Sequence, residues 1–238
     1  MYYDYGSRMA IGYGIDPMYI LVIIMGILCM AASARVNSVY RKYAMIRSMS
    51  GMTGAQAALE ILRRNGINDV AVCHVPGNLT DHYDPRNRTV NLSDATYGSN
   101  SVAAVGVAAH ECGHVLQHQT GYIPLQIRTA IVPAANIGSK AGIPLIILGM
   151  FLSFSPLITI GIWVFSLAVA FQVVTLPVEF NASRRALAML EEYGILGGEE
   201  IDASRKVLSA AAMTYVASAA SAVVQLMRLV LLNGRRRD

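Results

Sequence analysis

Three stretches of the chain are apolar and free of charge, and polar segments separate them. Residues 18–34 contain no charged side chain, and this length suits a slightly short membrane-spanning helix. Residues 141–178 are also uncharged, which is enough for two spans joined by a tight turn at residues 153–156. The third run, 207–227, is uncharged but rich in Ala and Ser. The pattern predicts three spans and leaves open whether the last run spans the membrane or packs on a polar domain.

Two shorter helices are predicted in the polar part of the chain. The first follows Thr53, which has the form of a capping box with Gln56, and it ends before residues 65–66. The second begins near residues 99–101, where Ser or Asn can cap it, and runs through His118. Together with the apolar runs, these helices predict a mainly α protein.

Short strands are predicted between those two helices. Their candidate ranges are 70–75, 78–83 and 88–92. Pro-Gly and Asp-Pro pairs interrupt them, as the turns of a small antiparallel sheet require. The strand before the second polar helix is a candidate for binding an extended substrate by edge addition.

Composition and charge agree with a membrane protein. Of the 238 residues, 54% are hydrophobic and 14% are charged, which is too apolar for an ordinary soluble domain. The first apolar run lacks a preceding basic region and a clear cleavage site, so it reads as a retained anchor. Basic residues concentrate after the first and third spans, and the positive-inside rule places both segments in the cytoplasm. The net charge of +4 is explained by this topology, and no nucleic-acid partner is expected.

The stretch from His110 to His114 is an H-E-x-x-H sequence on the second polar helix. A spacing of four places both imidazoles on one helix face, where they can share a zinc ion. Glu111 lies beside them and is placed to take a proton from a water on the metal. His118 lies about 12 Å from His110 along a straight helix, so one ion cannot bind both.

A hydrolytic zinc site needs a third protein ligand, and Glu179 is the best candidate. It follows directly on the uncharged run, and Pro177 suits a helix start, which predicts Glu179 in a first helical turn. An even number of spans between His114 and Glu179 returns the chain to the same side of the membrane. A carboxylate at a helix N-terminus is also favourable without a metal, so this assignment stays a prediction.

The motifs resemble one known family. The segments AAHECGHVLQH, LPVEFNASRRAL and GMTGAQAALEIL are similar to those of the YugP-type neutral zinc metallopeptidases, small bacterial multi-pass membrane proteins. More distantly, they resemble the HtpX heat-shock proteases and the CAAX prenyl proteases. The resemblance implies Zn²⁺ on His110, His114 and Glu179, with Glu111 as the catalytic carboxylate. It also implies a bacterial plasma membrane location, and the positive-inside rule places the active site on the cytoplasmic side.

One position departs from the wider group, which usually has an Asp that orients a zinc-bound His. Here Ser183 stands in its place, after Asn181. A hydroxyl can accept the imidazole N–H but brings no charge, so the ligand should be less basic. Asn181 is a second candidate for the same task.

A hydrolase also needs a donor for the oxyanion that develops during reaction. Candidates by residue type are His82, Tyr83, Arg184, Arg185 and Tyr215. Each also has a simpler interpretation. Tyr215 suits a tyrosine at the membrane interface, and His82 suits a solvated strand residue.

The sequence therefore predicts transmembrane helices plus a small cytoplasmic zincin-like α+β domain that carries the H-E-x-x-H helix. The expected ranges are an arm at 1–17, an anchor helix at 18–34, the domain at 35–130, two transmembrane helices at 131–178, and a third-ligand helix with the C-terminal helix at 179–238. The expected function is a zinc endopeptidase that acts on protein or peptide substrates at the bilayer. A zinc hydrolase of lipids and a non-catalytic zinc scaffold are the alternatives.

Overall fold

The computed structural model describes residues 17–234, which form six helices and one three-stranded sheet. The helices are α1 (Pro17–Ala44), α2 (Gly54–Arg64), α3 (Val102–Gln119), α4 (Ile123–Phe151), α5 (Ser155–Glu192) and α6 (Glu199–Gly234). The strands are β1 (Ala71–Val75), β2 (His82–Asp84) and β3 (Thr89–Ser93). The predicted arm before residue 17 and residues 235–238 lie outside the described residues. The mainly α class with a small sheet is confirmed.

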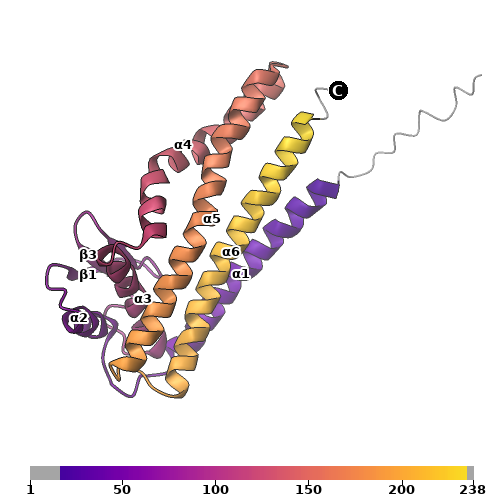
Figure 1. The fold of residues 1–238 in the computed structure, drawn as a ribbon. Helices are drawn as coiled ribbons and strands as arrows, with labels where there is room; N and C mark the ends of the chain where they lie inside the picture. The colour runs from indigo at the N-terminus through magenta and orange to yellow at the C-terminus, as the bar shows by residue number, and fades with distance from the viewer. Residues whose placement is uncertain (1–16, 235–238) are drawn as a thin grey trace, which may run out of the picture.

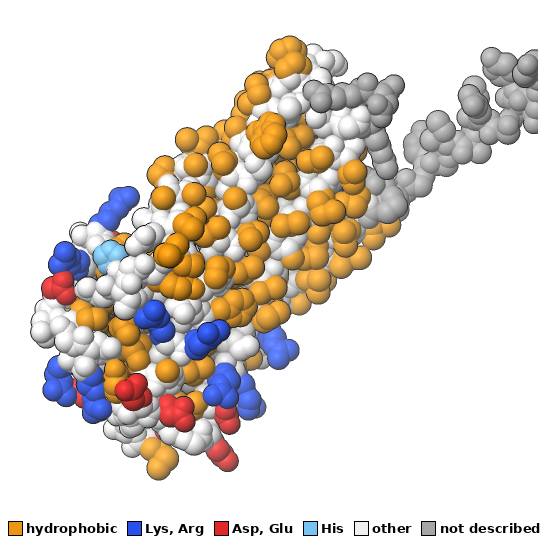
Figure 2. Space-filling model, in the orientation of Figure 1, with side chains coloured by type: hydrophobic (Ala, Val, Ile, Leu, Met, Phe, Trp, Pro, Cys, Tyr) orange, Lys and Arg blue, Asp and Glu red, His pale blue; other side chains and the backbone are white. Residues whose placement is uncertain are grey.

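Four helices form a long shaft, and the other elements gather at one end of it (Figure 1). Among the described residues, α1, α4, α5 and α6 are long and apolar enough to cross a membrane. Their outer faces carry large exposed apolar side chains such as Ile27, Trp163 and Leu231. Figure 2 shows this apolar surface along the shaft. Lys and Arg side chains gather at the end where the other elements lie. The sequence left open whether the last apolar run spans the membrane. In the structure this run is part of a fourth candidate span.

Helices α4 and α5 make the predicted hairpin, with its turn at residues 152–154. One expectation about α5 is wrong. Pro177 does not begin a helix, because α5 runs without interruption from Ser155 to Glu192. Proline inside a helix costs about 3 kcal/mol. Here Val178 and Ala182, on either side of Glu179, are fully buried beside α3, and this packing outweighs the local cost.

The small sheet is mixed rather than antiparallel, which corrects the prediction. Its order is β1-β3-β2, with β1 parallel and β2 antiparallel to β3. The segment between β1 and β3 contains β2, so the chain crosses over and returns parallel to β1. Strand β3 lies in the middle, with Val90 and Leu92 fully buried. It offers no free edge for a substrate strand, whereas β2 does.

Helix α3 passes through the centre of the compact end, packed against α1, α2, α5 and α6. Both predicted helix starts are confirmed. Thr53 and Gln56 form the reciprocal capping box of α2, and the Ser101 hydroxyl accepts the backbone N–H of Ala104 at the start of α3. Apolar side chains of the two helices, the sheet and the near ends of α5 and α6 form one core. The H-E-x-x-H segment is therefore held on a helix surrounded by protein.

Candidate metal centre

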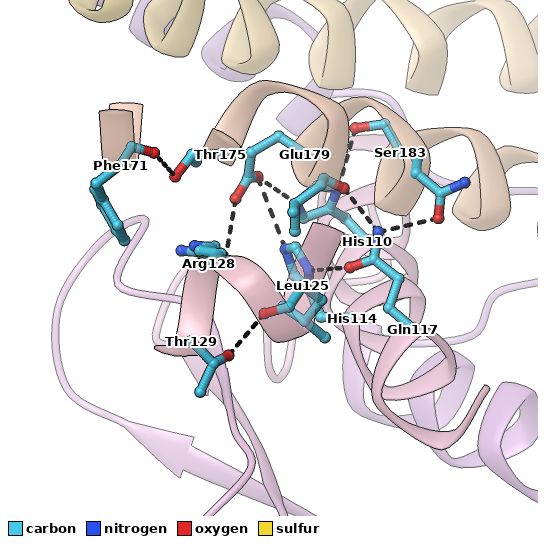
Figure 3. Close-up of polar contacts among 12 residues, drawn as sticks. His110, His114, Gln117, Leu125, Arg128, Thr129, Phe171, Thr175, Glu179 and Ser183 are labelled. Atoms are coloured by element: carbon cyan, nitrogen blue, oxygen red, sulfur yellow. Dashed lines mark hydrogen bonds and ion pairs between the residues drawn. The ribbon is translucent and has the colours of Figure 1, made fainter. Parts of the chain in front are cut away.

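Three side chains from two helices converge at the centre of the compact end (Figure 3). His110 and His114 come from α3, and Glu179 comes from α5. Their potential ligand atoms all lie within 4.8 Å of one another. Glu179 Oε2 is 3.3 Å from His110 Nε2 and 3.7 Å from His114 Nε2. Two ligands of a tetrahedral zinc lie about 3.3–3.4 Å apart when each bond is about 2.0–2.1 Å, so this donor set fits one ion.

The other ring nitrogen of each histidine is engaged by a neighbour. The Ser183 hydroxyl lies 3.1 Å from His110 Nδ1, and Gln117 Oε1 lies 3.0 Å from His114 Nδ1. Gln117 Nε2 donates to the Val178 carbonyl at 2.7 Å. Because that carbonyl can only accept, the amide orientation is settled and Oε1 accepts the Nδ1–H of His114. The Nε2 lone pair of His114 is then left facing Glu179 and available to a metal.

Glu179 is almost fully buried, at 3% exposure. Its Oε2 atom has no hydrogen-bond partner among residues 17–234, although buried carboxylate oxygens rarely lack one. Its Oε1 atom lies 3.7 Å from Arg128 Nη1 of α4, and the Arg128 guanidinium also stacks over the Phe171 ring. An oxygen that has no donor and faces two imidazole nitrogens is where a cation is expected.

Negative charge dominates the surroundings of His114. Burial acts against its charged form, but the nearby carboxylates of Glu179 and Glu111 outweigh burial, so the pKa of His114 is raised. The same carboxylates would favour a divalent cation in place of the proton.

A glycine brings the two ligand-bearing helices together. A Cβ atom added at Gly113 would lie 2.5 Å from the carbonyl oxygen of Ala182, which is far inside contact distance. Glycine therefore lets α3 touch the backbone of α5 at this point. This close approach places Glu179 within reach of both histidines. Cys112, in contrast, is fully buried on the far side with its thiol near the Ala58 carbonyl, and burial raises its pKa.

Two cavities meet at this centre. One, of about 360 Å³, extends between α1 and α6. The other, of about 420 Å³, extends under β2 and along α4. Both are lined by the same five residues, which are Asp81, His110, Glu111, Glu179 and Tyr215. The two cavities therefore adjoin at the metal centre, and Glu111 borders both of them.

The remaining candidate residues differ in their position relative to the cavities and the ligand set. His82, Tyr83 and Tyr215 line the cavities; the His82 Nδ1–H donates to the Thr80 carbonyl at 2.9 Å. Arg184 is exposed on α5 and lines neither cavity. His118 lies outside the ligand set, and its Nδ1 atom is 3.1 Å from the Tyr83 hydroxyl.

Asn181 sits one step further from the metal centre. Its Oδ1 atom accepts from Gln117 Nε2 at 3.0 Å and from Arg185 Nε at 2.9 Å. Asn181 thus contacts neither ring directly, and Gln117 stands between it and His114.

Two residues of the site were missed by the sequence reasoning. Gln117 follows His114 by three positions, a spacing that puts it on the same helix face. Arg128 is a charge within an apolar helix, and such residues mark functional positions in membrane proteins. Either signal points to these residues, but only the fold shows which atoms they meet.

Sequence comparison adds a family to this geometry. A family model described as "Putative neutral zinc metallopeptidase" matches residues 18–234. The chain belongs to this family. It is 47% identical over 206 residues to the "Putative membrane protease YugP" of Bacillus subtilis (strain 168), covering 86% of this chain and 92% of that protein. No solved structure matches the chain. The resemblance inferred from the motifs is thus confirmed, and the family implies zinc, which the His–His–Glu donor set fits.

Proposed function

We propose that this protein is a zinc-dependent endopeptidase of the membrane, with His110, His114 and Glu179 as metal ligands and Glu111 as general base. One observation carries the proposal. A largely buried set of three donors lies where two cavities adjoin, beside the Glu111 carboxylate. Structural zinc sites use four protein ligands, and catalytic sites use three.

The chain's own residues divide the chemistry among them. Zinc, when bound, would supply Lewis-acid polarisation of the scissile carbonyl and make an attacking water more acidic. The Glu111 carboxylate accepts a proton from that water and later delivers it to the leaving amine nitrogen. Ser183 and Gln117 hold the His110 and His114 rings with Nε2 toward the metal. Tyr215, which borders both cavities, donates its phenol O–H to the developing oxyanion.

The cavities favour an extended polypeptide as substrate. An endopeptidase must hold chain on both sides of the bond that it cuts, and the space here extends in two directions from Glu111. Strand β2 has a free edge in the sheet, and Asp81, His82 and Tyr83 at this edge line the cavity along α4. An extended segment could pair with β2 through its backbone, regardless of its sequence.

The position of the site favours substrates in or near the membrane. Val36 of α1, Val132 of α4 and Ala212 of α6 line the cavities, and each lies on a candidate span. The basic residues at the same end of the shaft agree with a cytoplasmic location in a bacterial plasma membrane.

This orientation is tested by labelling. An impermeant thiol reagent should label an Arg63→Cys variant in opened cells only; labelling of the variant in intact cells would reverse this topology.

The function is tested by measuring zinc content and proteolysis on the same purified samples. Wild type and Glu111→Gln should each hold one zinc, since Glu111 is not a ligand. Cleavage of casein, or of the protein itself, should fall about 10²- to 10⁴-fold in the variant. The matched control is Glu192→Gln, an exposed carboxylate on α5, which should cleave like wild type.

Two results would overturn the proposal. Full activity in Glu111→Gln would remove the general base. Stoichiometric zinc in the wild type, with phospholipid rather than protein hydrolysed, would instead assign the site to a lipid hydrolase.

A further inference from the structure

A third cavity, a groove, lies on the side of the α1–α6 pair opposite to the metal centre. Helices α1 and α6 run side by side (Figure 1), and a groove of about 1070 Å³ opens between them. Small and apolar side chains line most of it, including Leu28, Ala32, Val216 and Ala217. Because both helices are candidate spans, this part of the groove faces the hydrocarbon region of a bilayer.

One end of the same groove is basic. Arg35 and Lys42 of α1 and Arg205 and Lys206 of α6 line it. These residues lie in the last three turns of α1 and the first two turns of α6, so they share the end of the shaft next to the compact domain. Figure 2 shows Lys and Arg side chains gathered at this end of the visible face, below the apolar surface. The boundary between apolar and basic lining is where lipid headgroups begin.

The positive charge in the groove is largely uncompensated. No acidic residue is among those that line it in the described chain. Arg205 pairs with Asp202 at 2.9 Å, and both side chains are more than half exposed, at 58% and 62%. The Lys42 ammonium lies over the Tyr43 ring, which leaves its charge unneutralised. Two cations from each helix therefore surround one space without a matching set of carboxylates.

We propose that this groove is a binding site for an anionic phospholipid. The acyl chains lie between α1 and α6 against the small residues, and the phosphate sits among Arg35, Lys42, Arg205 and Lys206. A zwitterionic lipid carries no net charge to meet these cations, so the site selects for net negative headgroups. The inference is independent of the proposed peptidase activity, because it concerns a different face of the α1–α6 pair.

The first test measures lipid binding to the full-length protein by native mass spectrometry, with phosphatidylglycerol and phosphatidylcholine as probes. Wild type should retain phosphatidylglycerol in preference. The double variant Lys42→Gln with Lys206→Gln should bind it about thirtyfold more weakly, at about 1 kcal/mol for each cation lost. The matched control is Arg41→Gln with Arg47→Gln, which removes two exposed cations at the same membrane face but outside the groove lining.

The control variant separates a site from general surface attraction. Near wild-type binding by Arg41→Gln with Arg47→Gln supports the groove. An equal loss in both double variants would mean that any basic residue serves, and it would overturn the proposal. So would equal retention of both lipids by wild type.

A second pair of variants tests the apolar part with all charges kept. Ala217→Phe fills the groove, whereas Ser218→Phe places the same ring on the exposed neighbouring position. Phosphatidylglycerol should be lost from the first variant and kept by the second. Glycerol phosphate, which has no acyl chains, should not displace the lipid at equal concentration. Displacement by glycerol phosphate would show a free-phosphate site and contradict the lipid assignment.

Discussion

The two ends of helix α5 have different surroundings, although both belong to one continuous apolar helix. Toward its start, Trp163 and Leu167 are 71% and 42% exposed, in the part of the chain suited to lipid. Toward its end, Glu179 and Leu190 are 3% and 0% exposed, packed in the compact domain. In the shaft, the exposed apolar surface suits a lipid environment. In the domain, buried polar groups such as Gln117 are held by specific partners, here the Val178 carbonyl and Asn181. Hydrophobicity alone therefore does not say which end carries chemistry.

The largest effect should come from removing the buried carboxylate. Glu179→Ala should weaken zinc binding by more than about a hundredfold, since loss of a mere outer partner already costs about 10- to 100-fold. His118→Ala, on the same helix as the histidine ligands, should leave zinc affinity unchanged. Competition titration with a chelator gives both values. Weakened binding in the His118 variant alone would reverse the ligand assignment.

The next largest effect is expected on the free energy of unfolding, when two leucines of α5 are each replaced by alanine. Leu190→Ala creates a cavity in the protein core and should lower the free energy of unfolding by about 2–5 kcal/mol. Leu167→Ala should cost far less, because lipid chains can fill the space. Thermal unfolding in detergent or nanodiscs reports the difference. Equal destabilisation would show that this part of α5 is covered by protein rather than lipid.

A smaller effect is expected where α3 touches α5. Gly113→Ala places a methyl group against the Ala182 carbonyl and should cost about 1–3 kcal/mol of stability. The helices must separate, so zinc affinity should fall as well. Gly197→Ala has open space around it and serves as the control. A Gly113→Ala protein with normal zinc affinity would mean that the close approach does not position Glu179.

The smallest effect concerns the hydroxyl beside His110. Ser183→Ala removes the partner of Nδ1 and should reduce zinc affinity by about tenfold, the low end of the range for such partners, because the hydroxyl is neutral. Ser183→Asp restores the residue type common in the wider group and should bind zinc more tightly than wild type. If both variants match wild type, Ser183 does not orient the ring.

Local sequence signals were reliable where the contacts that decide a feature join residues close together in the sequence. The capping box at Thr53, the Ser101 cap and the α4–α5 turn each depend on a few adjacent residues. The spacing of His110 and His114 follows from helix geometry alone. These features could be read from the chain because neighbours in sequence are also neighbours in space.

Other features depended on contacts between distant segments. The parallel pairing of β1 with β3, the passage of α5 through Pro177, and the meeting of Gln117 with Val178 all join residues from separate elements. A proline predicts a helix end only when nothing packs on both sides of it. The amino-acid order thus determined the helix starts at Thr53 and Ser101 and the paired histidines of α3. The position of Glu179 beside those histidines, its contact with Arg128 and the two adjoining cavities came from packing, because burial of distant surfaces outweighs local preference.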